Sequence, residues 1–456
     1  MNRILIAAAT CFFAVSMSWA QTPTAGTKPP VDCDARTGQQ KAEWGRSPHA
    51  WLASVFHTER IEIEQTWCRT WATYGYDRAN KAEDFGRTFF TGDGVHPAFG
   101  SIVPGSGFAG GASINLERAL ASQPLRLQSS IEARESLNRF WVVGGQLSVL
   151  GSGAREGNRH NNANFAVRHA DLPQLTYYGI GSTSQKSDQA AYGMGDTTAE
   201  GRINFAVPKG FSFTGRLAGV SITPRGFHDS STPSIEQEFT PGNTPALNIS
   251  ITDVVYGGGV DWTYPEEERL RGYRAQVTST MQWFHGTNVS GYSFRRFDAT
   301  WLQRYTPDVG TDLGTVSVYA RVTESLATSG NAIPFYQQPT LGGTDIENQP
   351  TLRSYPDYRF RAPNLMLFQG EYERAIYHQL PLGFLFFYDV GKVAINRNDL
   401  DFTHMPHSFG VGITVHGGGL PLFRLYYSWG GHEGTRLYPL GNTNNFAAPG
   451  DLRGVF

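Results

Sequence analysis

Charge and cysteine are both scarce in this sequence. Charged residues make up 17% of the 456 residues, whereas soluble globular proteins usually carry about 25%. The formal net charge of −2 provides no basic surface that would favour a nucleic-acid partner. Only 3 cysteines occur, without a cysteine cluster or a His-Glu-x-x-His run, so we expect no metal and no other cofactor.

Long apolar runs are missing beyond the N-terminus. No later segment approaches the roughly 18 continuous apolar residues of a transmembrane helix. Residues 1–20 are typical of a signal peptide, with a positive charge at Arg3 and an apolar run from Ile4 to Met17. Ser18-Trp19-Ala20 then supplies small residues at the two cleavage positions. A membrane-anchoring helix is the alternative, but the run is shorter than the ~20 residues that span a bilayer.

Two cysteines remain once this segment is removed. Cys33 and Cys68 would then lie in an oxidising compartment, where an even pair can form a disulfide. Two unpaired thiols are the equal alternative, and the sequence does not decide between them.

Glycine and aromatic residues are abundant, with 52 glycines and an aromatic content of 13%. Combined with low charge, this composition fits a β-barrel whose outer face meets lipid and carries aromatic girdles. Several segments also alternate apolar and polar residues, as barrel strands do when successive side chains point to lipid and to the lumen. The clearest segments are 275–283, 315–323, 408–416 and 422–429. A soluble β-sandwich alternates too, but it does not normally repeat the pattern at transmembrane length over so much chain. We therefore predict an all-β fold, a transmembrane antiparallel β-barrel.

The predicted organisation has three parts. They are a signal peptide at 1–20, a periplasmic lead-in or partial plug at 21–95, and the barrel at 96–456. Long polar stretches rich in glycine and asparagine predict extracellular loops, and tight turns predict periplasmic links. The predicted loops are 152–163, 182–198, 226–250 and 326–351, and the predicted periplasmic turns are Lys209-Gly210 and Gly417-Gly418-Gly419.

A hairpin near the C-terminus is predicted to place two acids inside the barrel. The alternation in 365–375 and 384–392 puts Glu371 and Asp389 on the face opposite the lipid-facing residues. If the turn is centred on Leu380, the two carboxylates lie side by side on the lumen wall. Like charges opposed in a sheet destabilise it, so we expect a cation between them.

Arginine is the preferred cation at such a place. Its planar guanidinium can bond a carboxylate at two points, and it stays charged when buried. The preceding segment supplies Arg353, Arg359 and Arg361. The alternative is that these arginines only line a solvated pore, and the pattern alone favours neither reading.

Several motifs in the same region resemble those of a known family. They are Leu341-Gly342-Gly343-Thr344, Leu352-Arg353-Ser354-Tyr355, Tyr358-Arg359-Phe360-Arg361, Glu371 and Tyr388-Asp389-Val390-Gly391. Together they resemble the C-terminal signature of the BamA/TamA bacterial surface-antigen superfamily. The resemblance extends over about residues 95–456, and Asp171-Leu172-Pro173-Gln174 is similar to members that lack the periplasmic POTRA modules.

The resemblance implies a barrel of sixteen strands with a long sixth extracellular loop that folds back into the lumen. In the family, an Arg-Gly-Phe/Tyr motif of this loop binds acidic residues of the wall. By position these residues are Arg353, Glu371 and Asp389 here, and we expect them to form a loop-to-lumen lock. Ser354 stands where the family motif has glycine.

The resemblance also implies a location in the outer membrane of a Gram-negative bacterium. By analogy with family members, we expect the barrel to assist insertion or translocation of proteins or lipids, with a polypeptide or lipid client that the sequence does not identify. A loop-plugged passive channel or a structural outer-membrane protein is the alternative. The other expected partners are outer-membrane lipid and, through the terminal aromatic Phe456, the barrel assembly machinery during biogenesis.

An outer-membrane hydrolase is the least favoured hypothesis, and we expect no enzyme. The sequence has no Gly-x-Ser-x-Gly elbow. His404 and His407 flank Pro406, and His160 precedes two asparagines. We interpret all three histidines as solvated loop residues rather than catalytic groups or metal ligands.

Overall fold

The computed structural model describes most of the chain from Gly94 onward. The described residues are 94–119, 125–151, 161–227, 231–265, 272–307, 314–346, 349–375, 382–417, 420–431 and 433–441. The expected signal peptide, the lead-in, Cys33, Cys68 and His160 lie outside the described residues. What the sequence predicts for them stays a prediction.

The described chain is almost entirely β-structure. Sixteen strands form one antiparallel sheet in which each strand pairs with its neighbours in chain order. They are β1 (Gly94–Gly100), β2 (Ala109–Ala119), β3 (Arg126–Ser136), β4 (Trp141–Leu150), β5 (Asn162–Tyr177), β6 (Ala190–Val207), β7 (Phe211–Gly226), β8 (Ile251–Tyr264), β9 (Gly272–Gly286), β10 (Phe294–Thr306), β11 (Thr315–Ala327), β14 (Asn364–Ala375), β15 (Leu382–Ala394), β16 (His407–Gly417), β17 (Leu420–Trp429) and β18 (Thr435–Gly441).

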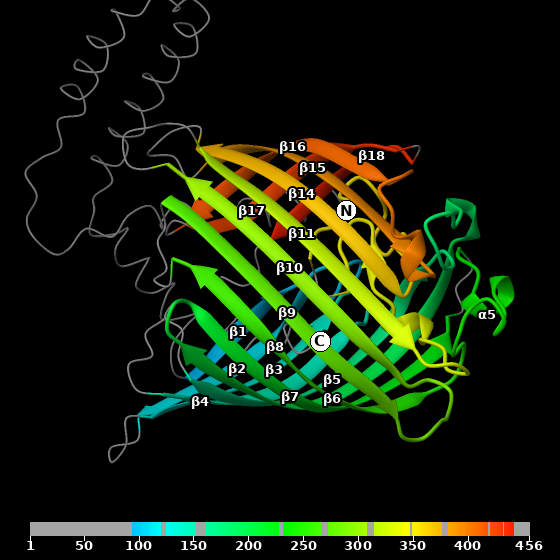
Figure 1. The fold of residues 1–456 in the computed structure, drawn as a ribbon, viewed down its shortest axis with the longest axis horizontal. Coiled ribbons are helices and arrows are strands. Elements are labelled where there is room, and N and C mark those ends of the chain that lie inside the picture. Colours follow the sequence, from blue (N-terminus) through cyan, green and yellow to red (C-terminus); the bar gives the residue numbers. More distant parts are fainter. Residues whose placement is uncertain are drawn as a thin grey trace, which may run out of the picture.

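The sheet curls around on itself, so that β15–β18 lie across from β4–β7 (Figure 1). The remaining elements are short and belong to the links. They are the helix α5 (Ile235–Glu238), the two-residue strands β12 (Thr340–Leu341) and β13 (Phe360–Arg361), and 3-10 turns at Lys186–Asp188, Phe335–Gln337 and Arg397–Asp399. The prediction of an all-β antiparallel barrel of sixteen strands is confirmed.

Alternation along the strands sorts side chains to the two faces of the sheet. In β15, Phe386 and Tyr388 are each 51% exposed, whereas the intervening Phe387 is 5% exposed and Asp389 is fully buried. Val316 and Val318 of β11 are likewise exposed. Apolar side chains therefore cover the outer face, which is the arrangement a strand needs when lipid surrounds it. No helix in the described ranges is long and apolar enough to cross a membrane.

The space inside the curve of the sheet is filled by loops, above all by residues 328–363 between β11 and β14, which we call the plug loop (Figure 1). Aromatic rings from the plug loop and the wall pack edge to face at its centre. Phe335 of the plug loop lies 5.2 Å from the Tyr177 ring and 5.0 Å from the Tyr192 ring, centroid to centroid. All three side chains are fully buried, so the loop has a hydrophobic core of its own with the wall.

The boundaries of two predicted extracellular loops differ from those of the structure. Asn162 and Ala163 of the predicted loop 152–163 belong to β5, and residues 152–160 lie outside the described residues. The second half of 182–198 belongs to β6. The glycines of this segment suggested a loop. Gly193 instead allows the Arg225 side chain to pack closely against the strand, because a Cβ on Gly193 would lie 2.8 Å from the Arg225 Nε.

Candidate functional site: the loop-to-wall contact

Arg353 reaches from the plug loop to two acids of the wall. Its Nε and Nη2 donate to the two carboxylate oxygens of Asp389 at 2.9 and 2.8 Å. Its Nη1 donates to Glu371 Oε2 at 2.7 Å. The Arg353 backbone N–H also donates to Asp389 Oδ2 at 3.2 Å. The structure thus brings together all three residues that the sequence singled out.

The register between the two acids differs from the predicted one. Gln369 lies opposite Asp389, and Glu371 lies opposite Phe387, so the two acids are diagonal neighbours on the inner face. Period-two alternation determines the face of a strand, whereas register depends on turn geometry. Centring the turn on Leu380 therefore placed each acid on the right face but shifted the pairing by two residues.

Burial makes the Arg353 contact strong and costly to break. Arg353 is 2% exposed and Asp389 is fully buried. The guanidinium carbon lies 3.7 Å from the centroid of the Phe387 ring, in cation–π contact. Burial would lower the pKa of the Arg353 guanidinium, but the Asp389 and Glu371 carboxylates outweigh it and raise that pKa. The arginine therefore carries a permanent charge that only the two acids neutralise.

Two further wall residues belong to this site, and sequence reasoning missed both. Gln369 donates from Nε2 to Asp389 Oδ1 at 3.0 Å. Arg424 of β17 approaches Glu371 Oε1 at 3.3 Å and Glu373 Oε2 at 3.2 Å. The inward position of Arg424 was visible in the alternation of 422–429, but its distance to Glu371 depends on the order of β14–β17.

Ser354 stands where the motif that this segment resembles has glycine, and its hydroxyl adds one contact that glycine cannot make. Its backbone N–H donates to Ser408 Oγ at 2.7 Å, and the two hydroxyl oxygens lie 2.5 Å apart. Both side chains are buried. Ser354 is not among the residues with a positive φ, so this backbone position does not require glycine. The Ser354–Ser408 pair is a second attachment of the plug loop to the wall, directly beside Arg353.

We expect Ser408→Ala to be more destabilising than Ser354→Ala. Ser408→Ala leaves the buried Ser354 N–H without an acceptor, which costs about 1–3 kcal/mol. Ser354→Ala keeps that acceptor and removes only the hydroxyl contact, so it costs about 1 kcal/mol or less. The heat-induced gel shift of the folded barrel measures both. Equal midpoints for the two variants would contradict the assigned role of Ser408.

The other arginines of the plug loop are buried, so they do not line a solvated pore. Arg359 donates from Nε to Glu433 at 2.8 Å and from Nη2 to the Ser184 carbonyl at 2.7 Å. Arg361 donates from Nη1 to the Phe335 carbonyl at 2.6 Å. Both side chains are almost completely inaccessible. The pore-lining alternative is therefore wrong for these residues.

The plug loop also contacts both end strands of the sheet or their links. Tyr358 donates from its hydroxyl to the Pro104 carbonyl, between β1 and β2, at 3.3 Å. Arg436 of β18 donates from Nη2 to Asp357 Oδ2 of the plug loop at 2.8 Å. One loop therefore contacts the first and the last parts of the sheet.

The side chains of His404 and His407 are exposed, although His407 directly precedes Ser408 in the chain. His404 lies in an exposed link and has a positive φ of 52°. His407 is the first residue of β16 rather than a loop residue, and its ring stacks on Tyr388 at 6.3 Å between centroids. Among the described residues, no group of three or more His, Cys, Asp or Glu side chains has a geometry that could hold a metal ion.

Comparison with known proteins supports the fold. No protein-family model matches the chain, and no curated protein matches its sequence. BamA from Haemophilus ducreyi lacking POTRA domains 1-3 matches with a TM-score of 0.50 and 12% identity, over 76% of this chain and 69% of that chain. CdiB from Acinetobacter baumannii has a TM-score of 0.44 and 12% identity, over 72% of this chain and 55% of that one. CdiB from Escherichia coli has a TM-score of 0.47 and 9% identity, over 76% and 61%. The chain therefore has the barrel fold of BamA, as its C-terminal motifs imply.

Proposed function

We propose that this protein is an outer-membrane barrel, closed by its own plug loop, that assists insertion or translocation of a polypeptide or lipid client. The exposed apolar outer face supports a lipid surrounding. The BamA fold, at a TM-score of 0.50, supports a general role in handling clients, by analogy. The client itself is a polypeptide or lipid that meets the barrel in the membrane.

The contact of Arg353 with Asp389 and Glu371 is the observation that carries this proposal. A barrel that merely stabilises the membrane has no use for a buried charged contact between a loop and the wall, since apolar packing would be as stable. A buried charged contact favours one position of the loop over all others, because every other position leaves a buried charge unpaired. Displacement of the plug loop would then open the lumen or loosen the end strands that it binds.

A passive channel is the second candidate function. The inner face supports it, because it is polar and its charges are largely paired across strands. Arg216 Nε approaches Glu200 Oε2 at 2.7 Å, and Arg168 contacts Asp196 in the same way. A polar lumen is typical of barrels that conduct solutes. In this reading the plug loop sets the conductance and no client exists.

An assembly assay in proteoliposomes tests the client hypothesis. We expect the reconstituted protein to accelerate insertion of an unfolded eight-stranded barrel, by roughly tenfold if it lowers the insertion barrier by about 1.4 kcal/mol. A parallel assay follows movement of a fluorescent lipid between leaflets. The control is the same protein reconstituted after heat unfolding. Rates equal to those of the control in both assays, together with steady ion conductance, would contradict client handling and favour the channel.

A further inference from the structure

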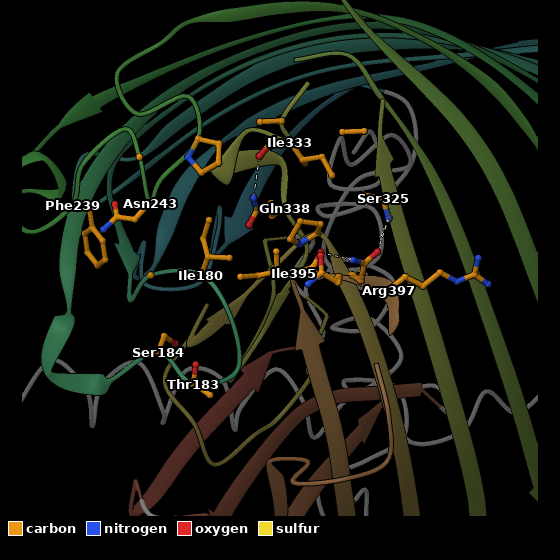
Figure 2. Close-up of a pocket in the computed structure, with 18 of the residues that line it drawn as sticks. Ile180, Thr183, Ser184, Phe239, Asn243, Ser325, Ile333, Gln338, Ile395 and Arg397 are labelled. Carbon is orange, nitrogen blue, oxygen red and sulfur yellow. Dashed lines mark hydrogen bonds between the residues drawn. The ribbon is translucent and has the colours of Figure 1, made fainter. Parts of the chain in front are cut away.

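A cavity of 810 Å³ lies where the plug loop meets three neighbouring links of the same rim. Its lining residues include residues of each of these segments (Figure 2). They are Ile180 and Ser184 of the β5–β6 link, Phe239 and Asn243 of the β7–β8 link, Gln338 of the plug loop and Arg397 of the β15–β16 link. The Arg353 contact does not line it. This volume is within the range of small-molecule sites, about 300–1,000 Å³.

Gln338 lines this cavity, and the oxygen of its side-chain amide is unused as an acceptor. The side chain is 4% exposed, and its Nε2 donates to the Ile333 carbonyl at 3.0 Å (Figure 2). This bond fixes the orientation of the amide, because a carbonyl oxygen accepts only from a nitrogen that carries hydrogen. Gln338 Oε1 is buried and has no hydrogen-bond partner. A buried acceptor without a partner costs stability, so a ligand donor at this place would be favoured.

Asn243, on a different link, supplies a donor to the same lining. Its Oδ1 accepts from the Thr240 backbone N–H at 2.9 Å, which leaves the Nδ2 hydrogens available to a ligand. Phe239 lies beside it, with one side of its ring against Tyr177 at 4.7 Å between centroids. The lining therefore combines amide donors and acceptors with an aromatic ring that is only partly covered.

The cavity lining contains one acid and one base, and the base is already paired. Asp188 is the lining acid, and Arg397 is the lining base, whose Nε approaches Glu324 Oε1 at 3.0 Å. A phosphate or carboxylate ligand would find no unpaired cation there, and a cation would find no unpaired acid beyond Asp188. Neutral groups that both donate and accept match the amides better. Hydroxyl groups on a ring with apolar C–H faces have this chemistry.

We propose that this cavity binds a neutral oligosaccharide. A sugar hydroxyl donates to Gln338 Oε1, another accepts from Asn243 Nδ2, and one C–H face of a sugar ring packs on Phe239. The position of the cavity on the outward rim rests on the proposed membrane orientation, whereas sugar binding does not depend on any client. The sugar is either free or part of an outer-leaflet lipid.

Binding is measured with the detergent-solubilised full barrel and a panel of neutral trisaccharides, including maltotriose and chitotriose, by ligand-observed NMR and calorimetry. We expect Gly242→Trp to abolish binding, since Gly242 lines the cavity and a Cβ there meets only Thr240 Oγ1 at 3.8 Å. Gly219→Trp is the matched control, because a Cβ on Gly219 has nothing within 4 Å and this β7 residue is not in the lining. Gln338→Leu should weaken binding roughly tenfold.

Two further comparisons decide the ligand class and its source. Lactose and 3′-sialyllactose differ by one acidic sugar, and we expect the neutral form to bind more tightly. If smooth lipopolysaccharide competes with the trisaccharide and lipid A does not, the source is the lipid glycan. If neither competes, the source is a free sugar. Absence of binding across the panel, or equal binding in Gly242→Trp and Gly219→Trp, overturns the proposal. Neither result bears on the client assay.

Discussion

Arg353→Ala is expected to open the lumen and to destabilise the barrel. Removing one partner of a buried charge pair leaves the Asp389 carboxylate without its cation, at a cost of about 3–5 kcal/mol. Asp389 is fully buried, so water screens this loss little. We expect a several-fold rise in single-channel conductance in planar bilayers, with frequent transitions between levels, and a lower midpoint of the heat-induced gel shift.

Arg397→Ala is the matched control for this substitution. Arg397 also pairs with an acid, Glu324, but its side chain is 63% exposed. An exposed pair contributes about 0–1 kcal/mol, so conductance and the gel-shift midpoint should stay close to those of the unaltered protein. If Arg353→Ala behaves like Arg397→Ala in both measurements, Arg353 does not hold the plug loop in the lumen.

Arg353→Lys separates charge from geometry. Lysine keeps the positive charge, but it has neither the fork that bonds both Asp389 oxygens nor the plane that lies over Phe387. We expect a conductance between those of the unaltered protein and Arg353→Ala. The ordering of the three proteins is informative in itself, because a purely electrostatic role would make the lysine variant indistinguishable from the unaltered protein.

Alternation was sufficient to predict which residues face inward in the strands where it is clearest. Glu371 and Asp389 illustrate this, since the inner face of each strand was evident from its aromatic neighbours. The need for a cation followed from their like charge. The identity of the cation did not follow, because three arginines stand within nine positions of one another in the plug loop. Resemblance to the family motif singled out Arg353.

Other features of the site depend on spatial arrangement that one sequence does not express. The Ser354–Ser408 pair joins residues 54 positions apart, and serine has no pattern that distinguishes a buried hydroxyl pair from a solvated one. The β6 residues from Ala190 onward were predicted to be a loop because glycine is frequent there. In the structure they form a strand, and the glycine at 193 leaves room for the Arg225 side chain. Both cases concern packing between separate segments of the chain, whereas alternation describes one strand at a time.

The serine pair allows a direct test of whether plug-loop displacement causes the open state. Ser354→Cys with Ser408→Cys places two thiols where the hydroxyl oxygens are 2.5 Å apart, close to the sulfur–sulfur bond length of about 2.05 Å. Cys33 and Cys68 are first replaced by serine so that only the new pair can form. Introduced into Arg353→Ala, the oxidised pair should return conductance to the level of the unaltered protein.

Reduction of the cross-link should then raise the conductance of the same molecules again. A damaged barrel would not be repaired by a bond between loop and wall, so reversible closure identifies loop displacement as the cause of conduction. In the client assay, the oxidised pair should also suppress assembly if the loop must leave its seat, and reduction should restore it. If the oxidised pair closes the pore but leaves the rate of client assembly unchanged, the client does not pass through the lumen. Its path would then lie along the ends of the sheet, which the plug loop contacts through Tyr358 and Asp357.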